Sequence, residues 1–551
     1  MIIKLERDSS GQVIKEWQND HWIASTYDEL GNRSQITSSL GAKIDVARND
    51  MGNVSQVTAS RLDQDYWKAT MQYNDLGQEI ERILPGDVSS KWQFDITGRP
   101  THHRINSQNR DTRRRVYNWD VNHRLRSMVN ELTGVKVTYG YDEFSNLVWS
   151  NQGGQFDFLH RSVDDVGSLY ETKEKTDRVY GAGSRLLETR EATFSYDDEG
   201  NLIQKLEKNG DMWKYEYNGN GMMSKVIRPD KEEVTFKYDP LGRRIEKSSN
   251  EKIMKFVWDG DTILHEYFSQ NNSDIFENLE ECSSQSKSEI PDNLVTWVFN
   301  EGFVPSAKIT SEGNYSIISD YLGTPVEAYD EDGNRVWSAE LDIYGRVKEF
   351  TGEKDFIPFR YQGQYEDVEI GLYYNRFRYY DPEQGNYTQI DPIGLAGGNP
   401  TLYGYVQDPN ILFDIFGLSI FSRSSWQAPN YGTGFNYTVY QQKIDWDLKI
   451  NIRGGGTETN LDRALRGHAP FVVKDGKYSK INLHHSKQNA AGALFELSAK
   501  THNKYKYYKA LHPYLPSAHP QNPVNRVLFN KDKEQYWMDR ANAEINRRKC
   551  K

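Results

Sequence analysis

Cysteine and long apolar runs are the two features that this sequence has least of. Its 551 residues include only two cysteines, Cys282 and Cys550, far apart in the chain. This excludes a disulfide framework and a four-cysteine zinc site. No stretch of about 18 apolar residues occurs, so we expect no transmembrane helix. The segment Met1–Arg7 lacks an apolar signal core, so we expect a protein that is cytoplasmic in the producing cell and needs another machine for export.

Aromatic residues and an uneven charge are what the sequence has instead. Aromatics make up 13%, with 35 tyrosines, which favours strands with one wet face. Residues 419–551 hold 22 Lys and Arg against 10 Asp and Glu, a net charge of +12, which leaves −23 on residues 1–418. A basic tail on an acidic body indicates two parts, with a polyanion as one partner for the tail and a solvated basic surface as the alternative.

A six-residue phrase recurs through the body: an aromatic, Asp or Asn, two variable residues, Gly, then Asn or Arg. Tyr27–Asn32 is one copy, and others begin at Arg48, Tyr73, Phe94, Trp119, Tyr141, Val163, Tyr196, Tyr217, Tyr238 and Tyr329. A period near 20 residues indicates stacked hairpins, with Asp and Gly in each turn. We therefore expect one long winding antiparallel sheet over residues 1–350, interrupted by an acidic insertion at 269–293, and repeat residues that build turns and core without chemistry.

Three further motifs close this region: Tyr361–Glu366, Gly371–Pro382 and Gly385–Leu395. With the repeats, they resemble the YD repeats and associated core of the Rhs family and of the C subunits of Tc toxins. The resemblance implies a mainly β body, residues 1–350 as a YD-repeat shell that spirals fully or partly around a toxin, and residues 351–418 as the Rhs-associated core. Two chains closing one shell together is a further arrangement.

Two related phrases lie at the end of the core, Asp391–Leu395 and Asp414–Leu418. By composition they are turn formers. The resemblance to Rhs cores implies an aspartyl autoprotease instead. By that match Asp391 and Asp414 are the catalytic pair, one of them keeping its proton. Arg378 orients them or stabilises charge, and the scissile bond is Leu418–Ser419. Ile415 replaces the family's Pro, so we expect a looser turn and a slower cut.

The tail, residues 419–551, carries a second pattern. Residues 478–485 alternate as a short strand that ends in His484 and His485, and Thr501–Leu511 is predicted to be a helix. A strand with paired histidines followed by a helix is the layout of an α+β, ββα-metal nuclease, in which a divalent metal neutralises the scissile phosphate and a neutral His accepts a proton from water.

Residues 483–485 and their surroundings resemble the LHH group of the HNH/endonuclease VII superfamily. The match implies that His484 is a metal ligand, that His485 is the general base and that His512 and His502 are further ligands. Glu496 is either a partner of an imidazole or a helix-surface charge. The metal is a divalent ion such as Zn²⁺, Mg²⁺, Mn²⁺ or Ni²⁺. Four lysines would contact the substrate's phosphates: Lys487, Lys504, Lys506 and Lys509. The alternative is that these lysines are simply solvated surface charges.

Together these features predict a polymorphic toxin of interbacterial competition whose nuclease is released by self-cleavage. DNA is the expected substrate, with RNA as an alternative. The resemblance implies a cognate immunity protein, spike or adaptor proteins of a type VI or similar secretion system, and action in the cytoplasm of the target cell. A different reading is a structural or adhesive repeat protein with a basic binding tail.

Overall fold

The computed structural model describes most of the chain. The described residues are 1–9, 12–62, 64–154, 157–250, 252–270, 290–300, 302–392, 401–418, 422–442, 444–451, 456–474, 477–485, 490, 494–499, 517–518 and 523–549. Most of the expected insertion at 269–293 and the whole expected helix Thr501–Leu511 lie outside them.

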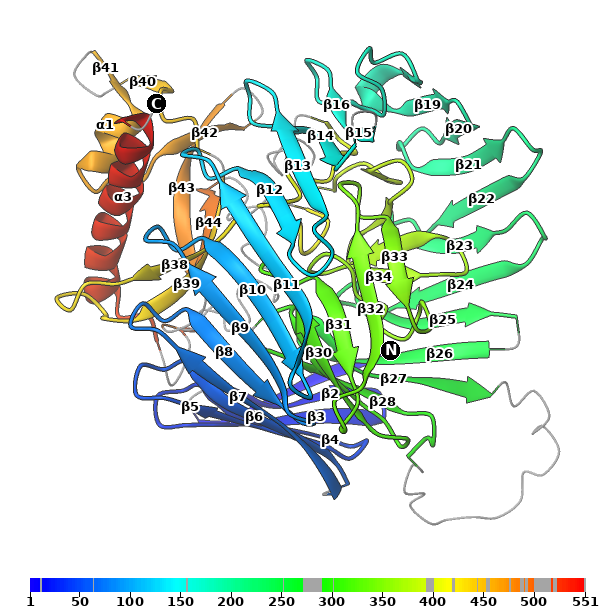
Figure 1. The fold of residues 1–551 in the computed structure, drawn as a ribbon, viewed down its shortest axis with the longest axis horizontal. Helices are drawn as coiled ribbons and strands as arrows, with labels where there is room; N and C mark the ends of the chain where they lie inside the picture. The colour runs from blue at the N-terminus through cyan, green and yellow to red at the C-terminus, as the bar shows by residue number, and fades with distance from the viewer. Residues whose placement is uncertain are drawn as a thin grey trace.

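The first large sheet is an antiparallel meander in which every strand pairs with its neighbours in sequence (Figure 1). Its fifteen strands are β1 (Ile3–Arg7), β2 (Val13–Gln18), β3 (His21–Tyr27), β4 (Arg33–Ser38), β5 (Ala42–Arg48), β6 (Val54–Arg61), β7 (Gln64–Tyr73), β8 (Glu79–Leu84), β9 (Val88–Phe94), β10 (Pro100–Ser107), β11 (Arg110–Trp119), β12 (Leu125–Asn130), β13 (Lys136–Tyr141), β14 (Leu147–Gln152) and β15 (Phe158–His160).

A second meander of sixteen strands follows a short link. The link holds β16 (Ser162–Val163) and β17 (Leu169–Tyr170), and a 3₁₀ turn, Ala182–Ser184, lies after the first strand of the second sheet. The strands are β18 (Arg178–Tyr180), β19 (Leu186–Thr189), β20 (Ala192–Tyr196), β21 (Leu202–Glu207), β22 (Met212–Tyr217), β23 (Met223–Ile227), β24 (Glu233–Tyr238), β25 (Arg244–Ser249), β26 (Lys252–Asp259), β27 (Thr262–Gln270), β28 (Val295–Phe299), β29 (Pro305–Ile309), β30 (Asn314–Ser319), β31 (Pro325–Tyr329), β32 (Arg335–Leu341) and β33 (Val347–Thr351).

The repeated phrase forms the turns of these meanders, as the sequence predicts. In the first copy, Gly31 has φ 79°, and the Asp28 carboxylate accepts the backbone N–H of Leu30 at 3.0 Å and of Asn32 at 2.8 Å. The Tyr27 hydroxyl donates to the Val13 carbonyl at 2.9 Å. Glycine permits the positive φ, Asp satisfies the turn's N–H groups, and the aromatic ties one hairpin to the one before it.

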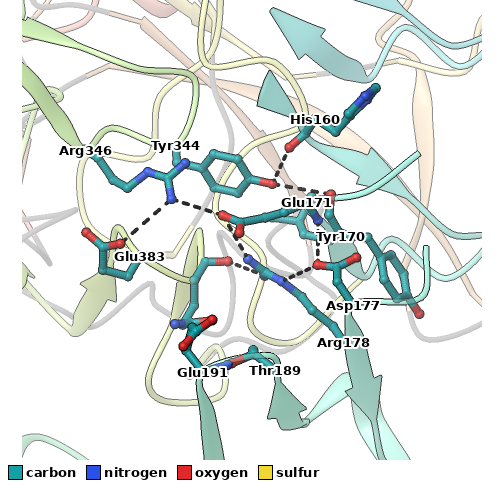
Figure 2. A network of polar contacts seen from close by, with 12 residues as sticks. His160, Tyr170, Glu171, Asp177, Arg178, Thr189, Glu191, Tyr344, Arg346 and Glu383 are labelled. Atoms are coloured by element: carbon teal, nitrogen blue, oxygen red, sulfur yellow. Dashed lines mark hydrogen bonds and ion pairs between the residues drawn. The ribbon is translucent and has the colours of Figure 1, made fainter. Parts of the chain in front are cut away.

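The body is therefore two sheets rather than the single continuous sheet expected over residues 1–350. The ladder breaks at the link, where residues 171–177 read Glu-Thr-Lys-Glu-Lys-Thr-Asp and offer no apolar alternation for a strand. Charged contacts hold the link in place: Glu171 pairs with Arg346 at 3.0 Å and with Arg178 at 3.6 Å (Figure 2). Arg346 precedes β33 and Arg178 begins β18, so this network joins both ends of the second sheet.

The two sheets pack against each other over an apolar cluster to which both contribute. Ile44 and Trp67 of the first sheet lie with Val298 and Ile318 of the second, all at most 4% exposed. The Trp67 indole donates to Ser316 across the interface at 2.8 Å. Where the sheets face each other, side chains fill the space between them, as the close packing of protein interiors requires.

The described residues of 352–418 form a plug against the second sheet. Its four short strands, β34 (Tyr365–Asp367), β35 (Leu372–Asn375), β36 (Arg378–Asp381) and β37 (Asn386–Tyr387), are almost wholly buried. Tyr365, Leu372, Tyr374 and Tyr379 pack into the largest apolar cluster, with residues from β19 to β32. Arg378 of the candidate cleavage site begins β36 of this sheet.

The C-terminal domain is a separate α+β unit beside the first sheet (Figure 1). Five strands are ordered β38-β39-β44-β43-β42, a two-stranded ribbon pairs β40 with β41, and helices α1 and α3 flank them. The bounds are β38 (Ser422–Gln427), β39 (Asn436–Gln441), β40 (Lys449–Asn451), β41 (Thr457–Thr459), α1 (Asn460–Leu465), β42 (Phe471–Lys474), β43 (Lys477–His485), β44 (Leu494–Ser498) and α3 (Arg526–Lys549). No helix in the described ranges is long and apolar enough to cross a membrane.

Candidate active sites

The structure brings together the three residues expected at the self-cleavage site. Arg378 stands at the start of β36, and its Nη2 atom lies 3.0 Å from Asp391 Oδ2 and 3.3 Å from Asp414 Oδ2. All three side chains are at most 4% exposed. One guanidinium nitrogen thus contacts both carboxylates. Residues 393–400, which include the end of the first phrase, lie outside the described residues.

The Arg378 cation bears on the charge of the two carboxylates. A cation in contact with two carboxylates favours the ionised form of each. Burial raises the cost of leaving either charge without its partner. The geometry shows Arg378 in contact with both buried carboxylates, and the expectation that one of the two keeps its proton stays a prediction.

The backbone on the N-terminal side of the expected scissile bond is held by the same residues. Asp414 Oδ1 accepts the N–H of Leu418 at 2.8 Å, and Arg378 Nε donates to the carbonyl of Gly417 at 2.5 Å. Gly417 has φ 64°, a conformation that favours glycine. The peptide that joins Gly417 and Leu418 is therefore fixed on both sides; Ser419, on the other side of the bond, lies outside the described residues.

Two residues that the sequence interpretation missed complete this site. The Tyr387 hydroxyl donates to Asp414 Oδ2 at 3.0 Å, and its ring lies 3.6 Å from the Arg378 guanidinium carbon. Asn375 Nδ2 donates to the Tyr387 oxygen at 2.7 Å and to the Asp414 carbonyl at 2.9 Å. Burial, together with the neighbouring Asp414 charge, raises the pKa of Tyr387 well above its usual value, so it stays a donor.

Ile415, which replaces the family's Pro, is buried against the plug. It is 2% exposed, and its carbonyl oxygen passes 2.1 Å from the point where a Cβ on Gly363 would lie. Glycine at 363, within the Tyr361–Glu366 motif, is what allows this close approach.

The expected strand before the paired histidines is present as β43, and its partner fixes which way each imidazole points. His484 lies opposite Phe495 and His485 lies opposite Leu494 in the antiparallel pair of β43 and β44. Directly opposed residues share a face and successive residues alternate, so the two imidazoles point to opposite faces of the sheet. They cannot both bind one ion in this strand conformation.

His485 points toward α3. Its ring centre lies 4.0 Å from that of Phe529 and it is 5% exposed. Burial lowers the pKa of His485 to about 3, outweighing a hydrogen bond to the Ala490 backbone. The imidazole is therefore neutral, and its Nε2 has no hydrogen-bond partner among the described residues. A neutral imidazole with an unengaged nitrogen can offer a lone pair there, which is what a proton acceptor or a metal ligand needs.

Glu496 is not a helix-surface charge, and among the described residues its hydrogen bonds go to no imidazole. It lies in β44, 1% exposed, where it pairs with Arg540 of α3 at 3.0 Å and accepts the Tyr536 hydroxyl at 2.6 Å. A strand buries alternate residues, so this carboxylate faces the helix and ties it to the sheet.

The remaining predicted site residues lie outside the described part of the chain: His502, His512, Lys487, Lys504, Lys506 and Lys509. Within the described part, no group of three or more His, Cys, Asp or Glu side chains could hold a metal ion. His484, His485 and Glu496 are the residues singled out in this domain by the sequence that lie in the described part.

Two family models match separate parts of the chain. The teneurin YD-shell family model matches residues 48–395. The chain belongs to the YD-shell family. Residues 459–543 match a second model, that of a nuclease of the HNH/ENDO VII superfamily with conserved LHH. The two resemblances predicted from the sequence are thereby confirmed.

Curated relatives of this YD-shell protein are longer than it is. Double-stranded DNA deaminase toxin A of Burkholderia cenocepacia (strain H111) is 26% identical over 525 residues, 89% of this chain and 36% of that protein. Probable deoxyribonuclease RhsB of Dickeya dadantii (strain 3937) is 25% identical over 450 residues, 76% of this chain and 29% of that protein. The chain therefore spans about a third of their length.

A solved structure shares the architecture. The crystal structure of TcdB2-TccC3-Cdc42 superposes with a TM-score of 0.54 at 17% identity and covers 76% of this chain and 24% of that one. At this identity the likeness shows a common fold.

Proposed function

We propose that this YD-shell protein is a Rhs-type polymorphic toxin whose residues 419–551 are a metal-dependent endonuclease, released by self-cleavage after Leu418. The match of residues 459–543 to the LHH nuclease family supports the nuclease most strongly. The adjacent histidines at the end of β43 also support it. DNA is the proposed substrate, and one relative is named a probable deoxyribonuclease.

In the proposed nuclease, His485 accepts a proton from the attacking water through its unengaged Nε2. Burial keeps this imidazole neutral. His484, with His512 and His502, would hold a divalent ion. When bound, this ion would neutralise the negative charge of the phosphate and of the leaving oxygen. Lys487, Lys504, Lys506 and Lys509 would contact flanking phosphates.

Plasmid digestion by the purified full chain tests the nuclease. We expect metal-dependent nicking that a chelator stops and that His485→Ala lowers by at least about 100-fold. His468→Ala, which removes an exposed histidine of the same domain, is the matched control. Cleavage of RNA alone would favour the RNase alternative. Binding of nucleic acid with no cleavage of either polymer would favour an adhesive or structural protein with a basic binding tail.

In the proposed self-cleavage, water adds to the Leu418 carbonyl carbon and the peptide nitrogen leaves as the amine of Ser419. Asp414 and Asp391 are the groups that take and return the proton, and Arg378 holds both carboxylates and the Gly417 carbonyl in position. Buried charged groups fixed before the reaction need no reorganisation during it.

The mass of the purified protein tests this proposal. We expect two fragments divided after Leu418 in the native chain and one intact chain in Asp391→Asn. Asp50→Asn, at an exposed repeat turn, is the control and should be cut like the native chain. An intact native chain after prolonged incubation would refute self-cleavage.

The proposed partners follow from the same assignment. An acidic immunity protein would suit the +12 domain. Spike or adaptor proteins of a secretion apparatus would carry the toxin from the producer to the cytoplasm of the target cell, and a second copy of the chain is a further partner for closing the shell.

A further inference from the structure

A cavity of about 40 Å³ lies between the plug and two hairpin turns of the second sheet, the turn from β26 to β27 and the turn from β28 to β29. This volume is enough for about three water molecules. Most of the side chains that line it are apolar, and they include Trp258, Phe299, Phe303, Phe359, Ile415 and Phe416. Neither of the two proposed active sites uses this cavity, so what it holds is a separate question.

Two buried polar side chains in the wall of the cavity have hydrogen-bonding atoms without partners among the described residues. Gln364 is 1% exposed, and both its Nε2 and its Oε1 are unengaged. Arg376 is 5% exposed, and its Nε and Nη1 are unengaged, whereas its Nη2 donates to the Leu241 carbonyl at 3.2 Å and to Asp261 at 3.3 Å. Buried polar groups in native proteins are nearly always hydrogen-bonded. The contents of the cavity are therefore the source of partners for these atoms.

The backbone holds both side chains in place. Arg376 has φ 60° in the two-residue turn between β35 and β36, and its guanidinium carbon lies 5.4 Å from the centre of the Trp258 ring. Gln364 closes a turn in which its N–H donates to the Tyr361 carbonyl at 2.8 Å, and its own carbonyl accepts the Arg360 N–H at 3.2 Å. Hydrogen-bonding groups that are fixed before binding lower the entropic cost of holding a ligand.

The unengaged atoms determine which ligand fits. They are three nitrogen donors and one oxygen acceptor, so the ligand must supply mainly acceptor atoms. Arg376 adds a positive charge, of which Asp261, with a side chain that is 28% exposed, offsets a part. Arg360, the other arginine in the wall, already donates to Glu366 and to backbone carbonyls. The aromatic wall disfavours an anion that is polar on every side, such as phosphate, and favours one with a small apolar part.

We infer that this cavity is a binding site for a carboxylate of two or three carbons, with acetate as the simplest case. The carboxylate oxygens accept hydrogen bonds from Arg376 and Gln364, and the alkyl group lies against the aromatic rings. A cation that donates to a carboxylate forms a stronger hydrogen bond than two neutral groups do. Because Ile415 and Phe416 directly follow Asp414, the bound ligand also packs against the segment that carries this carboxylate.

Titration of the purified protein with acetate tests the inference, with the dissociation constant read from saturation-transfer NMR of the acetate methyl group. Acetamide has the same shape without the charge and is the control ligand. Gln364→Glu places a carboxylate in the wall of the cavity with almost no change in side-chain size, so the protein's own carboxylate should replace the ligand. Gln93→Glu makes the same substitution at an exposed position of β9 and is the matched control.

We expect acetate to bind with a Kd of about 1 mM and acetamide to bind at least about tenfold more weakly. Gln364→Glu and Arg376→Gln should each weaken acetate binding by at least about tenfold, and Gln93→Glu should bind like the native protein. Asp261→Asn should tighten acetate binding by about threefold, because it removes a negative charge next to Arg376. A damaged fold would not tighten binding, so Asp261→Asn distinguishes a ligand site from a structural role of these residues.

Three results would each overturn the inference: no binding of acetate, equal affinity for acetate and acetamide, or equal acetate affinity in Gln364→Glu and Gln93→Glu. Each would leave water as the partner of the two side chains. The cavity lies within residues 258–416, so the titration requires neither self-cleavage nor nuclease activity. A failure of the proposed function would instead appear as an intact native chain or an inactive nuclease and would leave the titration unchanged.

Discussion

The turn at residues 238–243 and the turn at residues 413–418 are built on one phrase and differ in its last residue. Both read aromatic, Asp, two variable residues, Gly, and then a sixth residue, which is Arg243 in the repeat and Leu418 at the junction. In both, the carboxylate accepts the N–H of the sixth residue, at 2.9 Å and 2.8 Å.

The second carboxylate oxygen is where the turns diverge. In the repeat, Asp239 Oδ2 accepts Arg243 Nε at 2.5 Å, within its own turn. The leucine side chain has no hydrogen-bond donor, and Asp414 Oδ2 instead accepts hydrogen bonds from Tyr387 and Arg378. A structural turn thus becomes a candidate reactive group through the loss of one internal hydrogen bond and the gain of a buried cation.

The largest effect that separates the two turns should come from removing each carboxylate charge. Asp414→Asn should slow self-cleavage by about 1000-fold or more, because it removes a group that handles the proton. Asp239→Asn should leave cleavage of the folded protein unchanged and lower the free energy of unfolding by about 3 kcal/mol, since it breaks a buried ion pair. Mass spectrometry measures cleavage and urea denaturation measures stability in both variants. If Asp414→Asn were cleaved as fast as Asp239→Asn, the two turns would not differ in function.

Restoring the repeat's internal partner should weaken the junction. In Leu418→Asn, the new amide can donate to Asp414 Oδ2, as Asn32 does to Asp28 at 3.2 Å. One hydrogen bond to a charged group corresponds to about tenfold to 100-fold slower cleavage. Leu418→Met, which keeps an apolar side chain before the scissile bond, is the control. Equal cleavage rates in Leu418→Asn and Leu418→Met would contradict the view that an internal partner weakens Asp414 as a reactive group.

A smaller effect should follow from removing the Tyr387 hydroxyl. Tyr387→Phe keeps the ring over Arg378 and loses the donor to Asp414, so cleavage should slow by about tenfold. Tyr238→Phe removes a hydroxyl that donates to the Met223 carbonyl at 2.7 Å and should cost about 1 kcal/mol of stability with no change in cleavage. Similar cleavage time courses in the two variants would assign Tyr387 a purely structural role.

These contrasts also show what the sequence can and cannot predict. The period of the phrase predicts the turns and the meander, because Asp and positive-φ glycine act within a few residues. The division into two sheets was missed although residues 171–177 lack the apolar alternation of a strand. What the sequence could not predict is that the link packs against Arg346 from far along the chain. Tyr387 was missed because tyrosine is common throughout this chain, although the leucine at the sixth position of 413–418 was a readable signal that Asp414 needs another partner.

The smallest effect concerns repeats that depart from the phrase. Ser145 stands where the phrase has glycine, with φ 65°, in a turn whose N–H still bonds to the Asp142 carbonyl at 3.1 Å. Ser145→Gly should therefore raise the free energy of unfolding by about 0.5–1 kcal/mol, because a side chain is strained in this conformation. Gly52→Ala, with φ 82° and no atom within 4 Å of the added Cβ, should lower it by about 1 kcal/mol for the same reason. Urea denaturation of the two variants measures both signs. A loss of stability in Ser145→Gly would mean that the serine contributes a contact worth more than the strain it imposes, and that the degenerate copies are adapted rather than merely tolerated.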